Sequence, residues 1–384
     1  MRNNKKIYLD YNATTPVDKR VVEAMLPYFT ENFGNASSDH FSGWDAREGA
    51  ELAREQISNL LNCKPTGITF TSGATEAANL ALFGFCESNR SKGNHIITCK
   101  TEHKAILDCM QALENQGFEV TYLEVDSEGN IDLKELENAI SQETILVCLM
   151  LANNETGLIH PMKEIERIVH QKGVKLMSDI TQAVGKIPVD VKKLNLDIAV
   201  CSSHKLYGPK GVGALYINKK NDVMIGQTVF GGRQEKGIRP GTLNVPGIVG
   251  FGKAAEIAFS EMEADSKNVS ELRKRMEVLL AEIETTAVNS NKSNRLPNTT
   301  NITFNNIDGN QLLRRLNKLA VSRSSACTSN TINPSHVLTA MGKNKHQALS
   351  SLRISLGKNT SLEDIEFAVS EIQKTVDQLK TATV

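Results

Sequence analysis

Residues 69–76, TFTSGATE, combine a short run of β-branched and aromatic residues, a glycine turn and the start of an amphipathic stretch. A strand that turns directly into a helix is the unit from which parallel sheets are built. Short apolar runs and amphipathic stretches go on alternating to about residue 217. The alternation predicts βα units around a mostly parallel sheet, which is an α/β fold.

The same alternation gives the expected elements. Strands of the sheet are predicted at 67–71, 95–99, 119–124, 145–150, 174–178, 197–201 and 213–217. Helices are predicted among them at 74–90, 103–116, 132–140 and 161–171. A helical pattern then runs from 247 to about 286, and a polar loop at 289–294 precedes a strand at 301–305, a helix at 310–318, a strand at 320–323 and a helix at 362–380. We expect a large domain, 16–258, and a smaller α/β domain built from 1–15 and 259–384.

Charge and hydropathy exclude several classes of protein. The 384 residues include 44 basic and 44 acidic side chains, for a formal net charge of zero. A neutral chain has no electrostatic attraction for a nucleic-acid backbone, so no nucleic-acid partner is expected. No apolar run approaches the roughly 20 residues that span a bilayer, and the apolar stretch after the basic N-terminus is too short for a signal peptide. We therefore expect a cytoplasmic protein with no membrane partner.

The cysteines indicate reduced thiols, one of them unusual. There are seven, and no pair has the CxxC spacing, so neither a disulfide framework nor a metal site is expected. Most lie in apolar runs such as ILVCLM, 145–150, where cysteine behaves as a small hydrophobic residue. Cys327 instead lies among small polar residues in SSACTSN, 324–330. Thiolate chemistry needs such access, so Cys327 is a candidate nucleophile, with an ordinary loop thiol as the alternative.

The turn in TFTSGATE is a candidate anion site. The start of a helix presents free backbone N–H groups and the positive end of the helix dipole. Gly73 would let a ligand approach the backbone, and Thr75 would add a hydroxyl donor. A plain helix N-cap explains the same residues.

An acid and a lysine follow two other strands of the predicted sheet. Asp179 ends the run KLMSD, with Gln182 three residues later, and Lys205 lies in SSHKLYGPKG, 202–211, just after an apolar run. Ligands of parallel sheets bind beyond the carboxyl ends of the strands, so these side chains are expected at one site. A carboxylate for a ring nitrogen and a lysine for an aldehyde are the two anchors that pyridoxal phosphate requires. The alternative is that Asp179 caps the next helix and has no other role.

His103 and Arg353 complete the candidate site. His103 follows a predicted strand and opens a helix, so its imidazole could face the same edge, stack on an aromatic cofactor and move protons. Arg353 alternates with apolar residues in a predicted strand, and its forked cation suits the carboxylate of an amino acid. A structural salt bridge explains Arg353 equally well.

Together these segments resemble the cysteine desulfurases among the class V, fold-type I pyridoxal-phosphate enzymes, in particular the branch that feeds iron–sulfur cluster assembly. The likeness runs from Ile7 to about Leu379, nearly the whole chain. Its most specific pieces are TSGATEAANLAL (71–82), TEHKAILD (101–108), NNETG (153–157), SSHKLYGPKGVGALY (202–216), RPGTLNVPGIVG (239–250), SSACTS (324–329) and LRISLG (352–357). The resemblance implies the fold-type I transferase architecture, with a mostly parallel seven-stranded sheet and a smaller C-terminal α/β domain.

The resemblance also implies a role for each matching residue. Lys205 would hold pyridoxal phosphate covalently and shuttle the substrate Cα proton, Asp179 would pair with the ring nitrogen, and His103 would stack on the ring. The remaining cofactor contacts would come from Gly73, Ala74, Thr75, Ser202 and His204 around the phosphate, from Gln182 and Asn154 at the ring oxygen, and from Thr242 of a neighbouring subunit. Arg353, helped by Asn154, would hold the carboxylate of the substrate.

The implied reaction removes sulfur from free L-cysteine, gives L-alanine and leaves a persulfide on Cys327. A homodimer and a sulfur-acceptor protein, either a scaffold or a relay, are the implied partners. We expect no C-terminal extension of the kind that holds the scaffold in this branch, which leaves the acceptor open. The alternatives are a selenocysteine lyase, another class V enzyme such as an aminotransferase, and a non-catalytic sulfur-transfer partner. SSACTS argues against an aminotransferase, which needs no thiol, and Lys205, Asp179 and Cys327 together give the non-catalytic alternative no support.

Overall fold

A seven-stranded sheet lies at the centre of the computed structural model, which describes residues 5–290, 292–323 and 333–381. Its strand order is β2-β8-β7-β6-β5-β3-β4. The strands are β2 (Ile68–Thr71), β3 (His95–Cys99), β4 (Glu119–Leu123), β5 (Thr144–Cys148), β6 (Lys175–Asp179), β7 (Ile198–Ser202) and β8 (Gly213–Ile217). Only β8 is antiparallel to its neighbours, so the expected mostly parallel sheet is confirmed.

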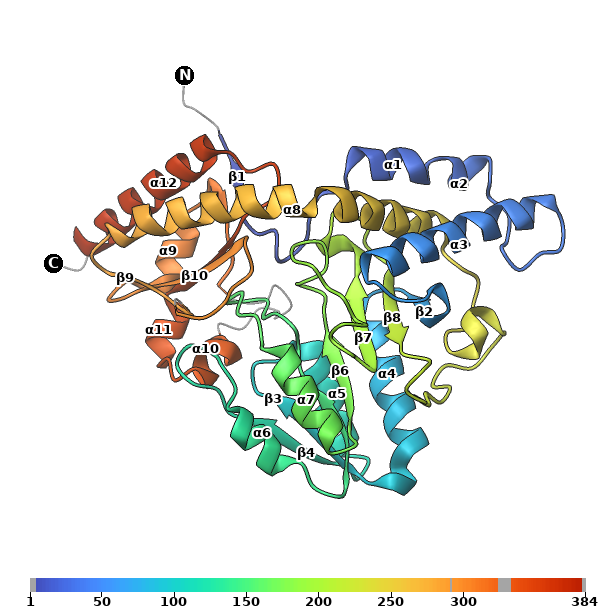
Figure 1. Cartoon of the computed structure of the whole chain (residues 1–384). Coiled ribbons are helices and arrows are strands. Elements are labelled where there is room, and N and C mark those ends of the chain that lie inside the picture. The colour runs from blue at the N-terminus through green and yellow to red at the C-terminus, as the bar shows by residue number, and fades with distance from the viewer. Residues whose placement is uncertain (1–4, 291, 324–332, 382–384) are drawn as a thin grey trace.

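Helices cover both faces of this sheet (Figure 1). One face packs against α4 (Ala74–Asn89) and α5 (Lys104–Glu114). The other face packs against α3 (Phe41–Leu60), α6 (Leu133–Ala139), α7 (Met162–Gln171) and the first half of α8 (Val245–Ala281). In α7 the buried residues Met162, Ile165 and Val169 recur every three or four positions, which gives the helix one apolar stripe for the sheet.

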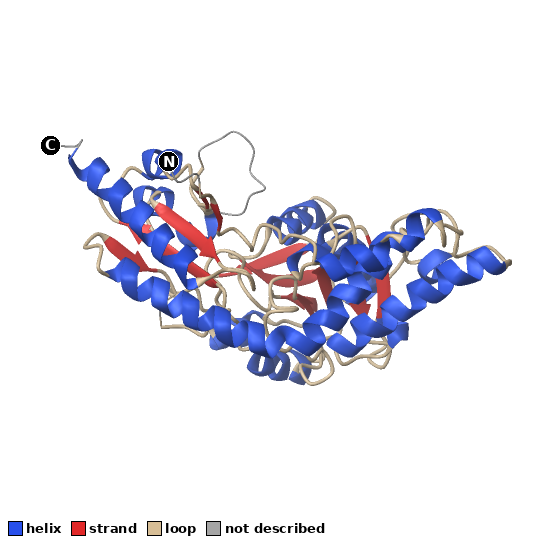
Figure 2. Cartoon of the chain, turned by 90° about the horizontal axis from the view of Figure 1, so that it is seen from above, coloured by secondary structure: helices blue, strands red, loops and turns tan. Residues whose placement is uncertain are grey.

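The C-terminal region forms a smaller α/β unit around its own core. Strands β9 (Thr286–Val288), β10 (Thr299–Phe304) and β12 (Ser351–Ser355) make an antiparallel sheet in the order β12-β10-β9. The N-terminal strand β1 (Ile7–Tyr8) pairs in parallel with β11 (Leu319–Ala320) beside it. The unit is completed by α9 (Gly309–Arg315), α10 (His336–Ala340), α11 (Lys345–Leu349) and α12 (Leu362–Thr381). Helix α8 runs unbroken from the large sheet to this unit, through the expected domain boundary at residue 258 (Figure 2).

Several elements differ from the sequence expectation. The helices α1 (Lys19–Met25), α2 (Pro27–Thr30), α3, α10 and α11 were not predicted. The face that α3 buries consists mostly of small residues such as Ala46, Ala50 and Ala53, so it carries little apolar signal. The expected helix to residue 286 ends at Ala281, and β9 begins at Thr286. In place of the expected strand at 320–323, β11 covers residues 319–320 beside β1, and Ser322 forms an isolated bridge with Arg353.

Within the part of the chain that the structure describes, no helix is both long and apolar enough to cross a membrane.

Candidate active site

One cavity of about 380 Å³ opens at the carboxyl ends of the central strands. Its size falls within the roughly 300–1,000 Å³ of small-molecule sites. Of the predicted site residues that the structure describes, all but Thr242 line it: Gly73, Ala74, Thr75, His103, Asn154, Asp179, Gln182, Ser202, His204, Lys205 and Arg353. Strands β2, β3, β5, β6 and β7 run in the same direction, so the segments after them meet at one edge of the sheet.

Asp179 and Lys205 border this cavity from the ends of neighbouring strands. Asp179 is the last residue of β6, and its Oδ1 accepts a hydrogen bond of 2.9 Å from the backbone N–H of Thr181. Residues 180–197 are all described and contain no helix, so this contact closes a turn and the helix-capping alternative is not met. The Nζ of Lys205 donates to the backbone oxygens of Asn12 and Ala13, at 2.6 and 2.7 Å. The carboxylate and the amine reach one cavity, as the two anchors require, and their roles remain predictions.

The N-terminus of α4 faces the cavity without a side-chain cap. Gly73 is the N-cap residue, no side chain bonds to the first turn, and the helix that follows is 16 residues long. Gly213 lets this turn lie directly against β7 and β8, because a Cβ there would be 2.7 Å from the backbone of Gly73. Free backbone N–H groups and the helix dipole make this end favourable for an anion.

The surroundings of His204 add to this preference for an anion. Burial lowers the pKa of His204 to about 4, with further contributions from the positive charges of Lys205, Lys210 and Lys186. The imidazole is therefore neutral near pH 7 and can donate one N–H. The positive potential that disfavours a second proton on His204 favours a bound phosphate.

His103 is the N-cap of α5. Its Nδ1 accepts a hydrogen bond of 3.1 Å from the backbone N–H of Ala105. In the neutral ring the proton must then lie on Nε2, so the cap fixes the tautomer as well as the ring position.

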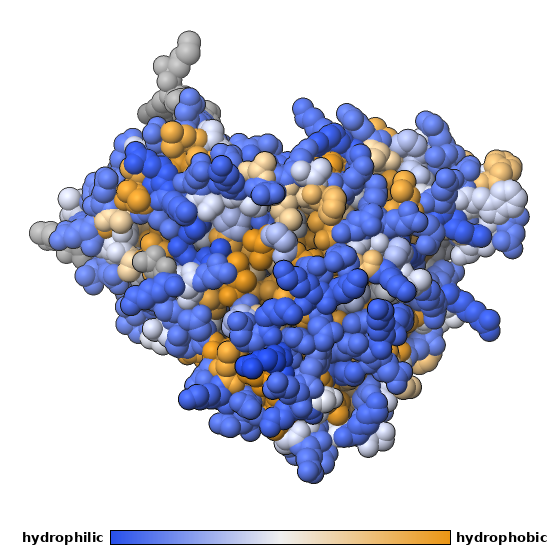
Figure 3. All heavy atoms as spheres, viewed as in Figure 1, coloured by the Kyte–Doolittle hydropathy of each residue, from blue (hydrophilic) through white to orange (hydrophobic). Residues whose placement is uncertain are grey.

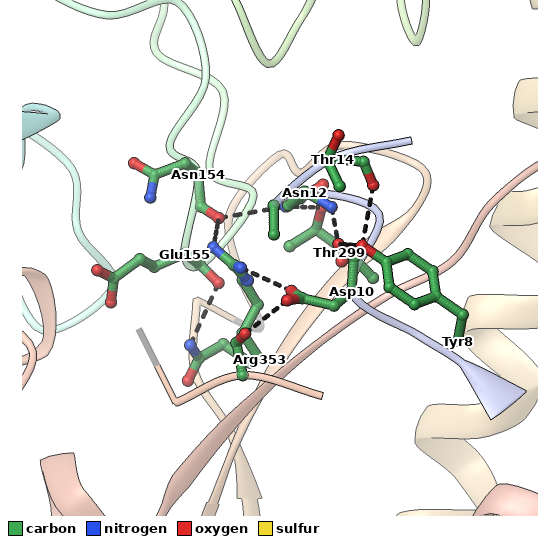
Figure 4. A network of polar contacts seen from close by, with 12 residues as sticks. Tyr8, Asp10, Asn12, Thr14, Asn154, Glu155, Thr299 and Arg353 are labelled. Carbon is green, nitrogen blue, oxygen red and sulfur yellow. Dashed lines mark hydrogen bonds and ion pairs between the residues drawn. The ribbon is translucent and has the colours of Figure 1, made fainter. Parts of the chain in front are cut away.

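Arg353 forms the structural salt bridge that the sequence left open, and its role toward a substrate carboxylate remains a prediction. Its side chain is 1% exposed, and Nη2 forms an ion pair of 2.7 Å with Asp10, as Figure 4 shows. Nη1 donates to the backbone oxygen of Asn154 at 3.1 Å. Nε has no hydrogen-bond partner among the described residues, so this buried cation keeps donor capacity beside the cavity.

Asn12 is a site residue that sequence reasoning missed (Figure 4). It is 1% exposed and lines the cavity. Its side chain donates to the backbone oxygen of Asn154 and to Thr299, while its own backbone oxygen accepts from Lys205. The only signal in the sequence is that Asp10, Tyr11 and Asn12 bring polar atoms just after the mostly apolar run 7–9.

Cys327 lies outside the described residues, and its role remains a prediction. The described residues on either side of 324–332 are tied to the surroundings of the cavity. Ser322 donates to Asp10, the partner of Arg353, at 2.7 Å. Ser335 bonds to Glu155, and His336 contacts the backbone oxygen of Glu102 at 2.9 Å. The described residues that flank 324–332 therefore contact residues around the cavity.

Thr242 is exposed and does not line the cavity of its own chain. The segment before it is held against α4 by an ion pair of 2.9 Å between Arg239 and Glu76. The described residues contain no group of three His, Cys, Asp or Glu side chains placed to hold a metal ion.

Residues 7–367 match the aminotransferase class-V family, and the chain belongs to it. The architecture is that of the fold-type I enzymes of this family, as the sequence predicted. A relative from Anaeromyxobacter sp. (strain Fw109-5), a cysteine desulfurase IscS, is 49% identical over 376 residues, which cover 97% of this chain and 93% of the relative. A solved NifS-like protein superimposes with a TM-score of 0.92 at 39% identity, over 97% of this chain and 100% of the other. SspA in complex with cysteine gives a TM-score of 0.81 at 34% identity, over 92% and 99% of the two chains.

Proposed function

We propose that this chain is a pyridoxal-phosphate-dependent cysteine desulfurase, which takes the sulfur of L-cysteine, releases L-alanine and leaves a persulfide on Cys327. The observation that carries the proposal is the meeting of Asp179 and Lys205 at one cavity, in a chain that is 49% identical to a cysteine desulfurase. Asp179 ends β6 and Lys205 follows β7, and the fold brings the two side chains to a common cavity.

The residues around the cavity fit pyridoxal phosphate. The uncapped start of α4, with Thr75, Ser202 and His204, offers donors and positive potential for the phosphate. Asp179 would face the ring nitrogen, Gln182 and Asn154 the ring oxygen, and His103 the ring face. Lys205 would attach the cofactor. When bound, pyridoxal phosphate supplies an electron-withdrawing ring that stabilises negative charge at the substrate Cα.

The side chains of this protein bind the substrate and transfer its protons. Arg353 and the amide of Asn154 hold the substrate carboxylate, which fixes the Cα–H bond toward the base. Lys205 accepts the Cα proton, and His103, with its tautomer fixed by the α5 cap, exchanges protons with the substrate. The Cys327 thiolate forms a bond to the substrate sulfur as the Cβ–S bond breaks. The electron pair of the broken bond stays on Cβ, which takes up a proton. Lys205 returns a proton to Cα, and alanine leaves.

A homodimer completes the proposal. Large apolar side chains are exposed around α1, α2 and the start of α3, from 56 to 73% each: Leu26, Phe29, Phe33, Phe41 and Trp44. We call these five residues the α1–α3 patch. Figure 3 shows hydrophobic surface at the tip of the molecule where Figure 1 places the start of α3. A second copy that covers the patch would remove these side chains from water. Thr242 is exposed, as it must be if it is to contact the site of a neighbouring subunit.

The acceptor of the sulfur is proposed only by class. An iron–sulfur scaffold or a thiolation relay would accept the outer sulfur of a Cys327 persulfide by attack of its own thiolate. We place this activity in the cytoplasm, because the six described cysteines are all free thiols.

The first experiment is spectroscopic. We expect the purified protein to be yellow, with a visible absorption band that borohydride removes because it reduces the bond to Lys205. Lys205→Ala should lose turnover altogether. A colourless protein that added pyridoxal phosphate cannot convert would contradict the whole proposal.

The persulfide step has its own test. Cys327→Ser should bind the cofactor and change its absorption spectrum on addition of L-cysteine, yet release no sulfide above background. Cys63→Ser is the matched control, because Cys63 is the one described cysteine that is not fully buried and it does not line the cavity. Wild-type sulfide release by Cys327→Ser would eliminate the persulfide.

A further inference from the structure

Lys186 is given no contact with cofactor or substrate in the proposed chemistry, yet it contacts a residue of the site. Its Nζ donates to the side-chain oxygen Oε1 of Gln182 at 2.7 Å and to the backbone oxygen of Gln182 at 3.1 Å. Lys186 does not line the cavity, whereas Gln182 does. The contact therefore reaches the cavity only through Gln182.

The other end of the Gln182 amide is fixed as well. Its Nε2 donates to the backbone oxygen of Asn12 at 3.0 Å. A carbonyl oxygen can only accept, so the nitrogen of the amide must face Asn12 and the oxygen must face Lys186. The two contacts define one orientation of the amide. In this orientation one hydrogen on Nε2 is donated to Asn12, and the second hydrogen is not used by that contact.

The same carbonyl joins this arrangement to Lys205. The backbone oxygen of Asn12 accepts from Gln182 Nε2 and also from Lys205 Nζ, at 2.6 Å. Lys186, Gln182, Asn12 and Lys205 therefore form one continuous chain of hydrogen bonds. A shift of the Gln182 amide would disturb the acceptor that Lys205 uses.

The position is a costly one for an amine. Burial lowers the pKa of Lys186 well below its usual value, and the positive charges of Lys205 and Arg353 lower it further. An apolar side chain of similar length would avoid both costs. The hydrogen bonds to Gln182 offset the cost of burying the amine. The amine can donate these bonds in its charged form and in its neutral form.

We infer that Lys186 is a positioning residue, which holds Oε1 of Gln182 away from the cavity so that Nε2 is presented as a donor to the ring oxygen of the cofactor. The inference rests on the proposed function, because it assigns Gln182 to that oxygen.

The test compares Lys186→Met, Gln182→Leu, the double variant and the wild type, each loaded with pyridoxal phosphate. The measurement is the pH midpoint at which the absorption band of the bound cofactor changes. A donor to the ring oxygen stabilises its deprotonated form, so losing the donor should raise the midpoint, by about one pH unit for Gln182→Leu, a tenfold change in the protonation equilibrium. Lys186→Met should raise it in the same direction, and the double variant should match Gln182→Leu alone.

Two further variants separate positioning from general damage. Lys186→Arg keeps a donor and should return the midpoint toward the wild-type value. Lys175→Met is the matched control, because Lys175 is also half-buried and bonds to a backbone oxygen, that of Asn221 at 2.6 Å, but lies at the opposite end of β6 from Asp179. It should leave the midpoint unchanged. Thermal unfolding of the cofactor-free variants checks that each one folds.

The inference is overturned if Lys186→Met titrates like the wild type while Gln182→Leu is shifted, or if the two shifts add in full in the double variant. A Gln182→Leu variant that titrates like the wild type also overturns it, because Gln182 would then not touch the ring oxygen. A wild-type protein that shows no cofactor band would instead overturn the proposed function itself.

Discussion

At the scale of single residues, Glu102 is a buried acid beside the site. Glu102 directly precedes His103 in the chain, and its side chain is fully buried. Its Oε1 accepts a hydrogen bond of 2.6 Å from the backbone N–H of Met150. Its Oε2 has no partner among the described residues. Burial raises the pKa of Glu102 well above its usual value, and the negative charge of Asp179 raises it further. Burial and the charge of Asp179 therefore both favour the protonated, neutral form of Glu102.

Glu102→Gln tests this protonation state through stability. Because the pKa of Glu102 is higher in the folded chain than in the unfolded chain, its contribution to stability is full below about pH 4.5 and is lost as the pH rises toward the folded pKa. Glutamine does not titrate, so the stability of Glu102→Gln relative to the wild type should rise with pH, by up to about 1.4 kcal/mol per pH unit.

Melting temperatures at pH 5 and pH 8 measure the difference. Glu119→Gln, which changes an exposed carboxylate on β4, should differ from the wild type by the same amount at both pH values. If Glu102→Gln instead loses stability relative to the wild type as the pH rises, the carboxylate is ionised and stabilised in the folded chain.

At the scale of elements, a buried ion pair holds the segment before α8 against the large sheet. Arg54 of α3 contacts both oxygens of Glu235, at 2.8 and 2.9 Å, and Glu235 also accepts from the backbone N–H of Phe70 in β2 at 2.8 Å. The side chain of Glu235 is 3% exposed. The contacts hold Glu235 and Lys236 in the left-handed backbone region, with φ of 45° and 57°.

Glu235→Ala should therefore be strongly destabilising. It leaves the Arg54 cation buried without its main partner, which typically costs about 3–5 kcal/mol. Glu51→Ala is the matched control, because Glu51 also pairs with Arg54, at 3.2 Å, but is 57% exposed and should cost about 1 kcal/mol or less. Urea unfolding curves give both values, and equal losses in the two variants would contradict the assignment of the main partner.

At the scale of the whole molecule, the α1–α3 patch predicts self-association. Phe41→Asp combined with Trp44→Asp places two charges within the patch and should convert a dimer into a monomer, as measured by sedimentation velocity. We expect the monomer to bind pyridoxal phosphate more weakly, since Thr242 of a neighbour would no longer reach the site.

Val278→Asp is the control for that experiment. Val278 is 56% exposed but lies near the C-terminal end of α8, beside the smaller unit and far along the helix from α3 (Figure 1). Val278→Asp should leave the mass of the sedimenting species unchanged, at that of the dimer. A Phe41→Asp, Trp44→Asp variant that sediments as the wild type does would show that the patch is not the dimer interface.

The sequence by itself determined the large sheet and the edge at which the site lies. Alternating apolar runs and the residues that end them are local properties, so all seven strands and the places of Asp179, His103 and Lys205 after them could be predicted. Helix α3 was missed because the face it buries is mostly small, and size rather than hydrophobicity fits it against α8.

Only the tertiary structure decided what surrounds those residues. Asp10 pairs with Arg353 across 343 positions of sequence, and Asn12 bonds to Asn154 across 142. Such contacts have no periodicity or spacing in the chain, because they form only when the N-terminal segment packs between the large sheet and the smaller unit. For the same reason the sequence marked Gln182 but not Lys186, whose part depends on the direction in which one amide points.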